Sequence, residues 1–217
     1  DGRLLSIAVT PRFSDAYPDT RAREFRTGEW GAPFDYHALG QIVDFMVLMT
    51  YDHHTTGTPP GPVAGYDWIR AALDYAASRV LRNRLVMGVP FYGREWVDTP
   101  RGVISRSLDY ETLRPLLERP GVEIRWHERW RTPWVQYRDE PDTHTLWFDD
   151  SRSYGEKLAL LRKYRLRGFA AWRLGIEDPG FWSVAAALRR TEPKSARAQG
   201  TKRASATRAP HGAPTSR

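Results

Sequence analysis

Four apolar runs, each ending abruptly in polar or aromatic residues, are the main pattern along this chain. They occupy residues 4–9, 43–49, 85–91 and 168–172. A run that is apolar on both faces is typical of a strand buried on both sides, as in parallel sheets and barrels. A parallel β/α fold positions its chemistry at the carboxyl ends of such strands. The polar groups that follow these runs are therefore expected to share one pocket.

Amphipathic segments between the runs predict helices. Asp67 is a plausible N-cap for a helix whose apolar residues recur at the spacing of one buried face. Ser153 and Glu156 predict a capping box, and Asp178, followed by proline, predicts the start of a closing helix. Strand, helix and strand in succession form the crossover unit of a parallel sheet, so the fold class is α/β. The predicted helices cover residues 36–42, 67–80, 153–164 and 179–188.

Residues 101–150 interrupt this alternation. A short helix near 109–118 precedes three segments in which apolar and polar residues alternate, at 122–130, 134–138 and 145–148. A period of two with turn residues between the segments predicts a small antiparallel insertion. Packing in that sheet is the favoured role for its tryptophans, and a separate sugar-binding platform is the alternative. These tryptophans are Trp126, Trp130, Trp134 and Trp147.

The net charge of +7 is located mainly in the carboxyl-terminal segment. Residues 193–217 hold six of the 33 Lys and Arg and none of the 26 Asp and Glu, so residues 1–192 are close to neutral. This segment is rich in Ser, Ala, Thr, Pro and Gly and lacks the apolar surface needed for a core. We therefore predict one domain over residues 1–190 and a disordered basic tail over 191–217, with a polyanion-binding arm as the alternative. No nucleic-acid partner is expected.

Composition excludes several kinds of site. The chain has no cysteine, which rules out disulfides and thiolate metal sites. The adjacent His53 and His54 are a poor metal site, because neighbouring side chains diverge and no third ligand is evident. No apolar stretch approaches the roughly 20 residues of a membrane helix. No signal peptide opens the chain, and because it begins with Asp1 rather than Met, we expect a start further upstream.

Three strand-end motifs resemble those of family 18 glycoside hydrolases, the chitinase-like (β/α)8 barrels. They are Met49–Asp52, Gly88–Trp96 and Trp172–Asp178. Ala64–Trp68 and Trp147–Asp150 are similar to the bacterial branch that includes spore-cortex and other peptidoglycan N-acetylglucosaminidases. The resemblance implies a partial TIM barrel made of about its last four β/α units, with an α+β insertion before the last strand. It also implies a bacterial protein that is exported or associated with the cell wall.

The function implied by this resemblance is hydrolysis of β-1,4 bonds in N-acetylglucosamine polymers such as chitin or peptidoglycan. In the family, the substrate's own acetamide attacks the anomeric carbon, with retention of configuration and without a cofactor. Tyr51 and Asp52 would orient that acetamide, and Met49 would line the pocket. Trp172 would provide an aromatic floor beneath the sugar. The remaining residues expected to bind substrate are Tyr92, Arg94, Trp96 and Glu177.

Each of these roles has a structural alternative. The Tyr-Asp pair could cap the loop that follows its strand. Trp172 could be buried as filling of the barrel. Arg94 could form a salt bridge at the rim with Glu95 or Glu177.

The catalytic acid of the family has no counterpart in this sequence. Its signature is Asp-x-x-Asp-x-Asp-x-Glu at the end of the fourth barrel strand, and no such run occurs here. A complete barrel takes about 250 residues, so the amino-terminal half is expected to be missing. Glu95, Glu177 and Asp178 lie at strand ends, but we nominate none of them as the acid. The chain is therefore expected to be part of a longer hydrolase. A non-catalytic N-acetylglucosamine-binding protein and an inactive fragment are the alternatives.

Overall fold

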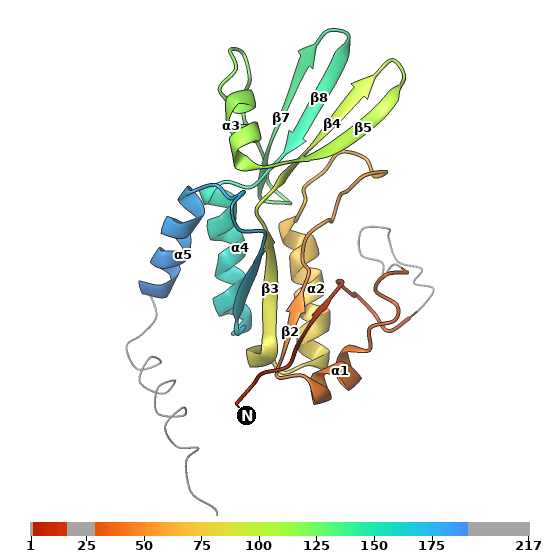
Figure 1. Cartoon of the computed structure of the whole chain (residues 1–217), viewed down its shortest axis with the longest axis vertical. Helices are drawn as coiled ribbons and strands as arrows, with labels where there is room; N and C mark the ends of the chain where they lie inside the picture. The colour runs from red at the N-terminus through yellow and green to blue at the C-terminus, as the bar shows by residue number, and fades with distance from the viewer. Residues whose placement is uncertain (1, 17–28, 191–217) are drawn as a thin grey trace, which may run out of the picture.

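The computed structural model describes residues 2–16 and 29–190 (Figure 1). Four parallel strands, in the order β1-β2-β3-β9, form the first sheet. Their carboxyl ends all lie at the same edge of the sheet, where a second, five-stranded antiparallel sheet is inserted. The predicted tail at 191–217 lies outside the described residues. The parallel strands are β1 (Ser6–Val9), β2 (Phe45–Leu48), β3 (Leu85–Pro90) and β9 (Gly168–Trp172).

Helices pack against one face of the parallel sheet. Ile7 and Val9 of β1 contact the apolar core under these helices, whereas Ser6 and Ala8, which point to the other face, are exposed. Strand β3 lies inside the sheet and is buried throughout, as its continuous apolar run predicted. The helices are α1 (Tyr36–Ile42), α2 (Tyr66–Arg79), the 3-10 helix η2 (Arg82–Arg84), α4 (Ser151–Tyr164) and α5 (Gly180–Arg190).

Two predicted helix caps are wrong. Helix α2 has Gly65 as its N-cap, without a side-chain bond, and Asp67 lies inside the first turn. Helix α4 is capped by Asp150, which forms a capping box with Ser153. In both helices the backbone turns into the helix before the predicted cap, two residues earlier in α2 and three residues earlier in α4. Glu156 instead accepts a hydrogen bond of 2.6 Å from Arg131 Nη1.

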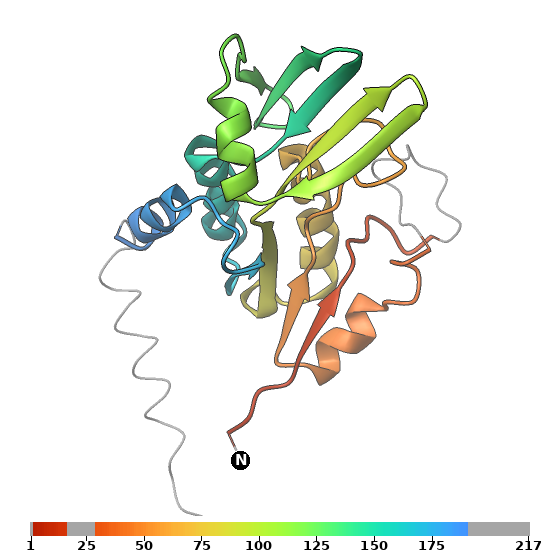
Figure 2. The ribbon, with the colours of Figure 1, turned by 45° about the horizontal axis from the view of Figure 1, so that its top comes forward.

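The antiparallel insertion begins earlier than residue 101. Strands β4 and β5 form a hairpin, and β4 already begins at Gly93, directly after β3. This sheet, with α3 beside it, stands above the parallel part of the molecule (Figure 2). Its elements are β4 (Gly93–Thr99), β5 (Gly102–Leu108), α3 (Tyr110–Leu117), β6 (Arg125–His127), β7 (Thr132–Asp139) and β8 (Asp142–Trp147).

Three of the four tryptophans of the insertion pack against one another, in agreement with the favoured prediction. Trp147 is buried and stacks on Trp134, with 5.5 Å between ring centroids, while Trp130 meets its edge at 5.3 Å. Trp126 is half-buried, and the guanidinium of Arg152 lies 3.6 Å above its ring. The contact between Trp126 and Arg152 joins the inserted sheet to α4.

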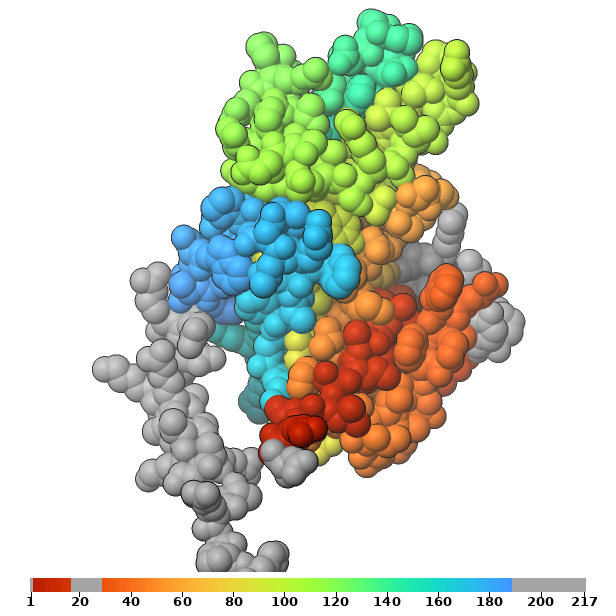
Figure 3. Space-filling model, viewed as in Figure 1, coloured from red at the N-terminus to blue at the C-terminus, as the bar shows by residue number. Residues whose placement is uncertain are grey.

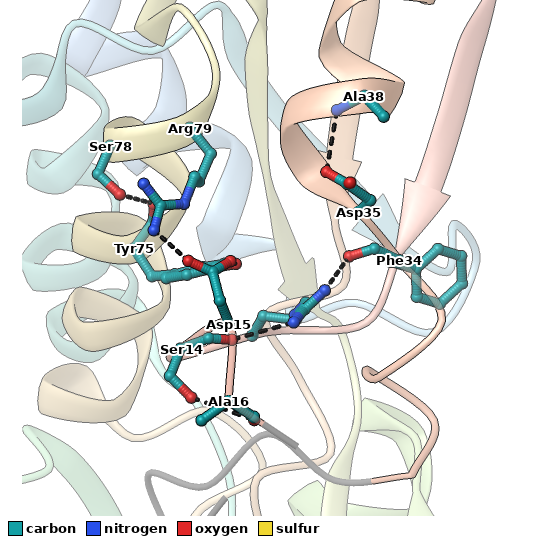
Figure 4. A network of polar contacts seen from close by, with 10 residues as sticks. Ser14, Asp15, Ala16, Phe34, Asp35, Ala38, Tyr75, Ser78 and Arg79 are labelled. Atoms are coloured by element: carbon teal, nitrogen blue, oxygen red, sulfur yellow. Dashed lines mark hydrogen bonds and ion pairs between the residues drawn. The ribbon is translucent and has the colours of Figure 1, made fainter. Parts of the chain in front are cut away.

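The segment after β1 is fixed to two helices by polar contacts (Figure 4). Asp15 accepts a hydrogen bond of 2.5 Å from the Tyr75 hydroxyl of α2 and pairs with Arg79. Arg12 donates to the carbonyl of Phe34, just before α1. These bonds position the carboxyl end of β1 relative to α1 and α2.

Candidate functional site

A hollow with a volume of about 360 Å³ lies where the parallel strands meet the inserted sheet. Asp52 follows β2, Tyr92 and Arg94 follow β3, and Trp172 ends β9, so all three predicted strand-end motifs contribute to it. Figure 3 shows the segment after β9 directly beneath the inserted residues. The other lining residues are Ser107, Leu108, Asp109, Arg173 and Ile176.

Close packing of β2 on β3 positions the Tyr-Asp pair. Thr50 Oγ1 donates a hydrogen bond of 2.7 Å to the carbonyl of Gly88, which holds the end of β2 against β3. A Cβ at Gly88 would lie 2.5 Å from the carbonyl oxygen of Leu48 and 2.9 Å from the ring of Tyr51. Only glycine therefore permits this approach of the two strands.

Asp52 is the polar centre of the hollow. Its Oδ1 accepts a hydrogen bond of 2.6 Å from the hydroxyl of Tyr92 and lies 3.6 Å from Arg94 Nη2. Its backbone has φ of 60°, a left-handed conformation that Asp tolerates better than most residues. Backbone strain of this kind is common at functional sites. The Asp52 side chain is half exposed, so its carboxylate can reach a ligand.

Burial and the negative charge of Asp52 both raise the pKa of the neighbouring phenols. Burial is the larger cause for Tyr92, and Asp52 adds to it through its charge and its hydrogen bond. Tyr51 is half-buried, and its pKa is raised by burial first and by Asp52 second. Both hydroxyls therefore keep their protons at neutral pH and can act as hydrogen-bond donors.

Some of the predicted substrate-binding residues line the hollow and others do not. Trp172 is 57% exposed, so it is not buried as barrel filling. Arg94 is buried and pairs with Asp52, and its Nη1 donates to Thr56 Oγ1 at 3.2 Å. The alternative pairing of Arg94 with Glu95 is wrong, because Glu95 pairs with Arg106 and His144 instead. Met49 is half-buried at the end of β2.

Four predicted site residues are not among those that line the hollow: Met49, Tyr51, Trp96 and Glu177. Trp96 is 2% exposed in the inserted sheet, and its Nε1 donates a hydrogen bond of 3.0 Å to the carbonyl of Thr58. The prediction that Trp96 contributes to the exposed sugar-binding surface is therefore wrong. The physical reason is that the residues after β3 form strand β4 of the inserted sheet rather than an open loop at the strand end.

Glu177 is occupied within its own loop. Its carboxylate accepts hydrogen bonds from the backbone N–H groups of Gly175 and Ile176 and from Trp182 Nε1, at 2.6, 3.0 and 3.2 Å. Bonds from the backbone are the largest cause of the lowered pKa of this carboxyl. Glu177 thus stabilises the loop after β9 and does not contribute to the hollow.

Ser107, Asp109 and Arg173 were not among the predicted site residues. Ser107 and Asp109 belong to the inserted sheet and the N-cap of α3, so only the tertiary structure brings them to the strand ends. Arg173 directly follows Trp172, and its place one residue after a strand could have drawn attention to it.

His53 lies between two indoles and outside the hollow. Its ring stacks on Trp68 at 4.8 Å between centroids and meets Trp130 edge-on at 6.1 Å. Neither ring nitrogen has a hydrogen-bond partner among the residues that the structure describes. Burial is the main cause that lowers the pKa of His53 to about 2. Within residues 2–16 and 29–190, no three His, Cys, Asp or Glu side chains are grouped to hold a metal ion.

The buried neutral state of His53 predicts acid sensitivity. An unfolded chain binds a proton at its histidines below about pH 6.5, whereas folded His53 does not until about pH 2. The free energy of unfolding should therefore fall by about 1.4 kcal/mol per pH unit below pH 6.5 through this residue alone. Urea unfolding at pH 7 and pH 5 measures the change. His53→Phe should lose this dependence and the exposed control His37→Gln should keep it; an unchanged slope in His53→Phe contradicts the assignment.

The fold and the hollow define a class of protein: an α/β, TIM-barrel-like protein whose strand-end carboxylate, phenols and exposed indole suit a carbohydrate. A family model for "Glycosyl hydrolases family 18" matches residues 1–177. The chain therefore belongs to family 18 of the glycosyl hydrolases.

Proteins similar to this chain include enzymes of spore-forming bacteria. The chain is 31% identical over 184 residues to the "Putative sporulation-specific glycosylase YdhD" of Bacillus subtilis, covering 83% of this chain and 41% of that protein. It is 31% identical over 185 residues to the "Cortical fragment-lytic enzyme" of the same organism, covering 84% of this chain and 41% of that protein. The chain thus spans about two fifths of the length of these curated relatives.

Solved structures show the same fold. The crystal structure of the Bacillus cereus spore cortex-lytic enzyme SleL matches with a TM-score of 0.75 and 28% identity, over 85% of this chain and 41% of that chain. A chitinase from Chromobacterium violaceum matches with a TM-score of 0.73 and 29% identity, over 84% of this chain and 54% of that one. These names favour a glycoside hydrolase over a non-catalytic sugar-binding protein. No described helix is both long enough and apolar enough to cross a membrane.

Proposed function

We propose that this chain forms the carboxyl-terminal half of a family 18 barrel and, in the complete domain, hydrolyses β-1,4 bonds next to N-acetylglucosamine. The observation that carries the proposal is the meeting of Asp52, Tyr92 and Trp172 around one hollow. A half-exposed carboxylate and a protonated phenol can hold an acetamide, and an exposed indole can pack on the apolar face of a pyranose. These groups would serve the acetamide and the sugar ring in substrate-assisted retaining catalysis, which also requires a general acid.

In this proposal the residues act in a defined order. Trp172 holds the sugar in a distorted shape, and Tyr51 donates a hydrogen bond to the acetamide oxygen as it attacks the anomeric carbon. The positive charge that develops on the acetamide nitrogen is stabilised by the carboxylate of Asp52. Met49, Tyr92 and Arg94 support these groups from the strand ends. The acid that protonates the leaving oxygen comes from a β/α unit outside this chain, and water then opens the cyclic intermediate.

Hydrolysis is tested with the chain joined to the amino-terminal half of its domain. We expect release of reducing ends from chitin oligosaccharides or from peptidoglycan, and release from neither would contradict the proposal. Trp172→Ala should raise KM about 10-fold, because the sugar loses its stacking surface. Trp172→Phe is the matched control, since it keeps a flat ring, and it should lose less. Equal KM values for Trp172→Ala and the unchanged protein would remove Trp172 from the site.

A further inference from the structure

Arg173 places a positive charge on the wall of the hollow. It follows Trp172 directly, is exposed, and lines the hollow together with residues of the inserted sheet. Its guanidinium makes no ion pair and no hydrogen bond with any residue in the described part of the chain. An arginine whose five donors are unused in a ligand-sized hollow is available to a ligand.

The other charges of the hollow are already paired. Asp52 is shared by Tyr92 and Arg94. Asp109 accepts a hydrogen bond of 2.8 Å from the backbone N–H of Thr112 as the N-cap of α3. Its bonds with Thr112 are the main cause of its lowered pKa, and the positive charge of Arg173 contributes to the lowering. Among the charged groups lining the hollow, Arg173 is therefore the one whose charge is not held by a hydrogen bond or ion pair with a described residue.

The backbone that carries Arg173 is fixed on both sides. The carbonyl of Trp172 accepts a hydrogen bond of 2.8 Å from the N–H of Phe91, which attaches the end of β9 to β3. Further along the loop, Glu177 binds two backbone N–H groups, and the carbonyl of Ile176 accepts a bond of 3.1 Å from Tyr110 N at the start of α3. Arg173 is thus held at the wall beside the indole.

We infer that Arg173 binds a carboxylate on a sugar next to the one above Trp172, so that the hollow prefers an anionic acetamido glycan to a neutral one. The planar guanidinium matches a carboxylate with two parallel hydrogen bonds. A neutral polymer would cover this cation without pairing it, which disfavours that polymer. Chitin is uncharged, whereas a peptidoglycan strand carries a lactyl group on alternate sugars, and this group is a free carboxylate wherever its peptide has been removed. The inference rests on the proposed function and assigns its substrate class.

Binding by the full chain tests this assignment. The ligands are a chitin tetrasaccharide, a peptidoglycan tetrasaccharide without peptide, and the methyl ester of the latter, each titrated by following tryptophan fluorescence. We expect the carboxylated sugar to bind about 10-fold more tightly than the other two, with an advantage that falls as salt is raised. Arg173→Gln should abolish the advantage, and it should bind the chitin tetrasaccharide at least as tightly as the unchanged chain, because the neutral sugar no longer covers an unpaired cation. Arg138→Gln, on exposed Arg138 of β7, is the control and should change nothing.

The outcomes separate the two proposals. If the chain binds all three sugars equally, or if Arg173→Gln keeps the preference, the role of Arg173 is wrong while the sugar site remains. If none of the sugars binds, both the assignment of Arg173 and the proposed sugar site are contradicted. Arg173→Lys should retain part of the preference, because it keeps the charge and loses the two-point geometry.

Discussion

Replacing Asp52 by Asn should lower the kcat of the complete domain about 10²- to 10³-fold. The change removes the negative charge that we propose stabilises the cyclic intermediate, and it also replaces the acceptor that Tyr92 uses at 2.6 Å. Asn keeps the shape of Asp and adopts the left-handed backbone of this position at least as readily. Initial rates on the preferred glycan, compared between the two proteins at equal concentration, measure the effect.

Two comparisons make the loss specific. Asp98→Asn alters an exposed carboxylate near the far end of β4 and should leave kcat unchanged. The melting temperature of Asp52→Asn should fall somewhat, because the buried Arg94 loses its anionic partner, so the rates are compared well below that temperature. Full activity in Asp52→Asn would exclude Asp52 from the reaction.

Lys157→Met should destabilise the protein by about 3–5 kcal/mol. Lys157 of α4 is 1% exposed, and its Nζ pairs with Asp149, which is itself 8% exposed and lies between β8 and α4. Burial lowers the pKa of Lys157, and the nearby carboxylate opposes that shift. Methionine fills much the same space but leaves the Asp149 carboxylate buried without its cation. Urea unfolding of the two proteins gives the difference in the free energy of unfolding.

The double variant Lys157→Met, Asp149→Leu distinguishes charge from packing. It removes both charges, so it should recover most of the stability that the single change loses. Lys163→Met, on the exposed side of the same helix, should have little effect. If the single and double variants are equally unstable, the loss comes from packing and the account of the ion pair is wrong.

The four parallel strands could be predicted from the sequence because their signal is local. Residues 85–91 are apolar without interruption, and the structure places β3 at Leu85–Pro90 inside the sheet. Strands β4 and β5 were missed for the opposite reason. Their residues mix charged and apolar types, and what makes them strands is pairing with each other and with β8. The pairing with β8 depends on residues distant in sequence, which a local pattern does not contain.

The candidate site shows the same division. Tyr92 and Trp172 could be proposed because each follows an apolar strand, and parallel strands end at the same edge. The burial of Trp96 could not be predicted in this way. It depends on a loop distant in sequence, in which the carbonyl of Thr58 accepts a hydrogen bond from Trp96 Nε1. Likewise, the composition of the loop after β9 does not reveal that the carboxylate of Glu177 accepts hydrogen bonds from backbone N–H groups.

The α/β class, the order of the strand-end motifs and the family could all be inferred from the amino-acid sequence, because periodicity and motif spacing are properties of neighbouring residues. Which side chains share the hollow depends on the packing of the two sheets. Ser107 and Asp109 of the insertion line the same hollow as Trp172. Trp96 is buried, whereas Arg173 is exposed and lines the hollow. The physical reason is that burial and charge pairing depend on contacts between segments far apart in the chain, which become defined only when the two sheets pack together.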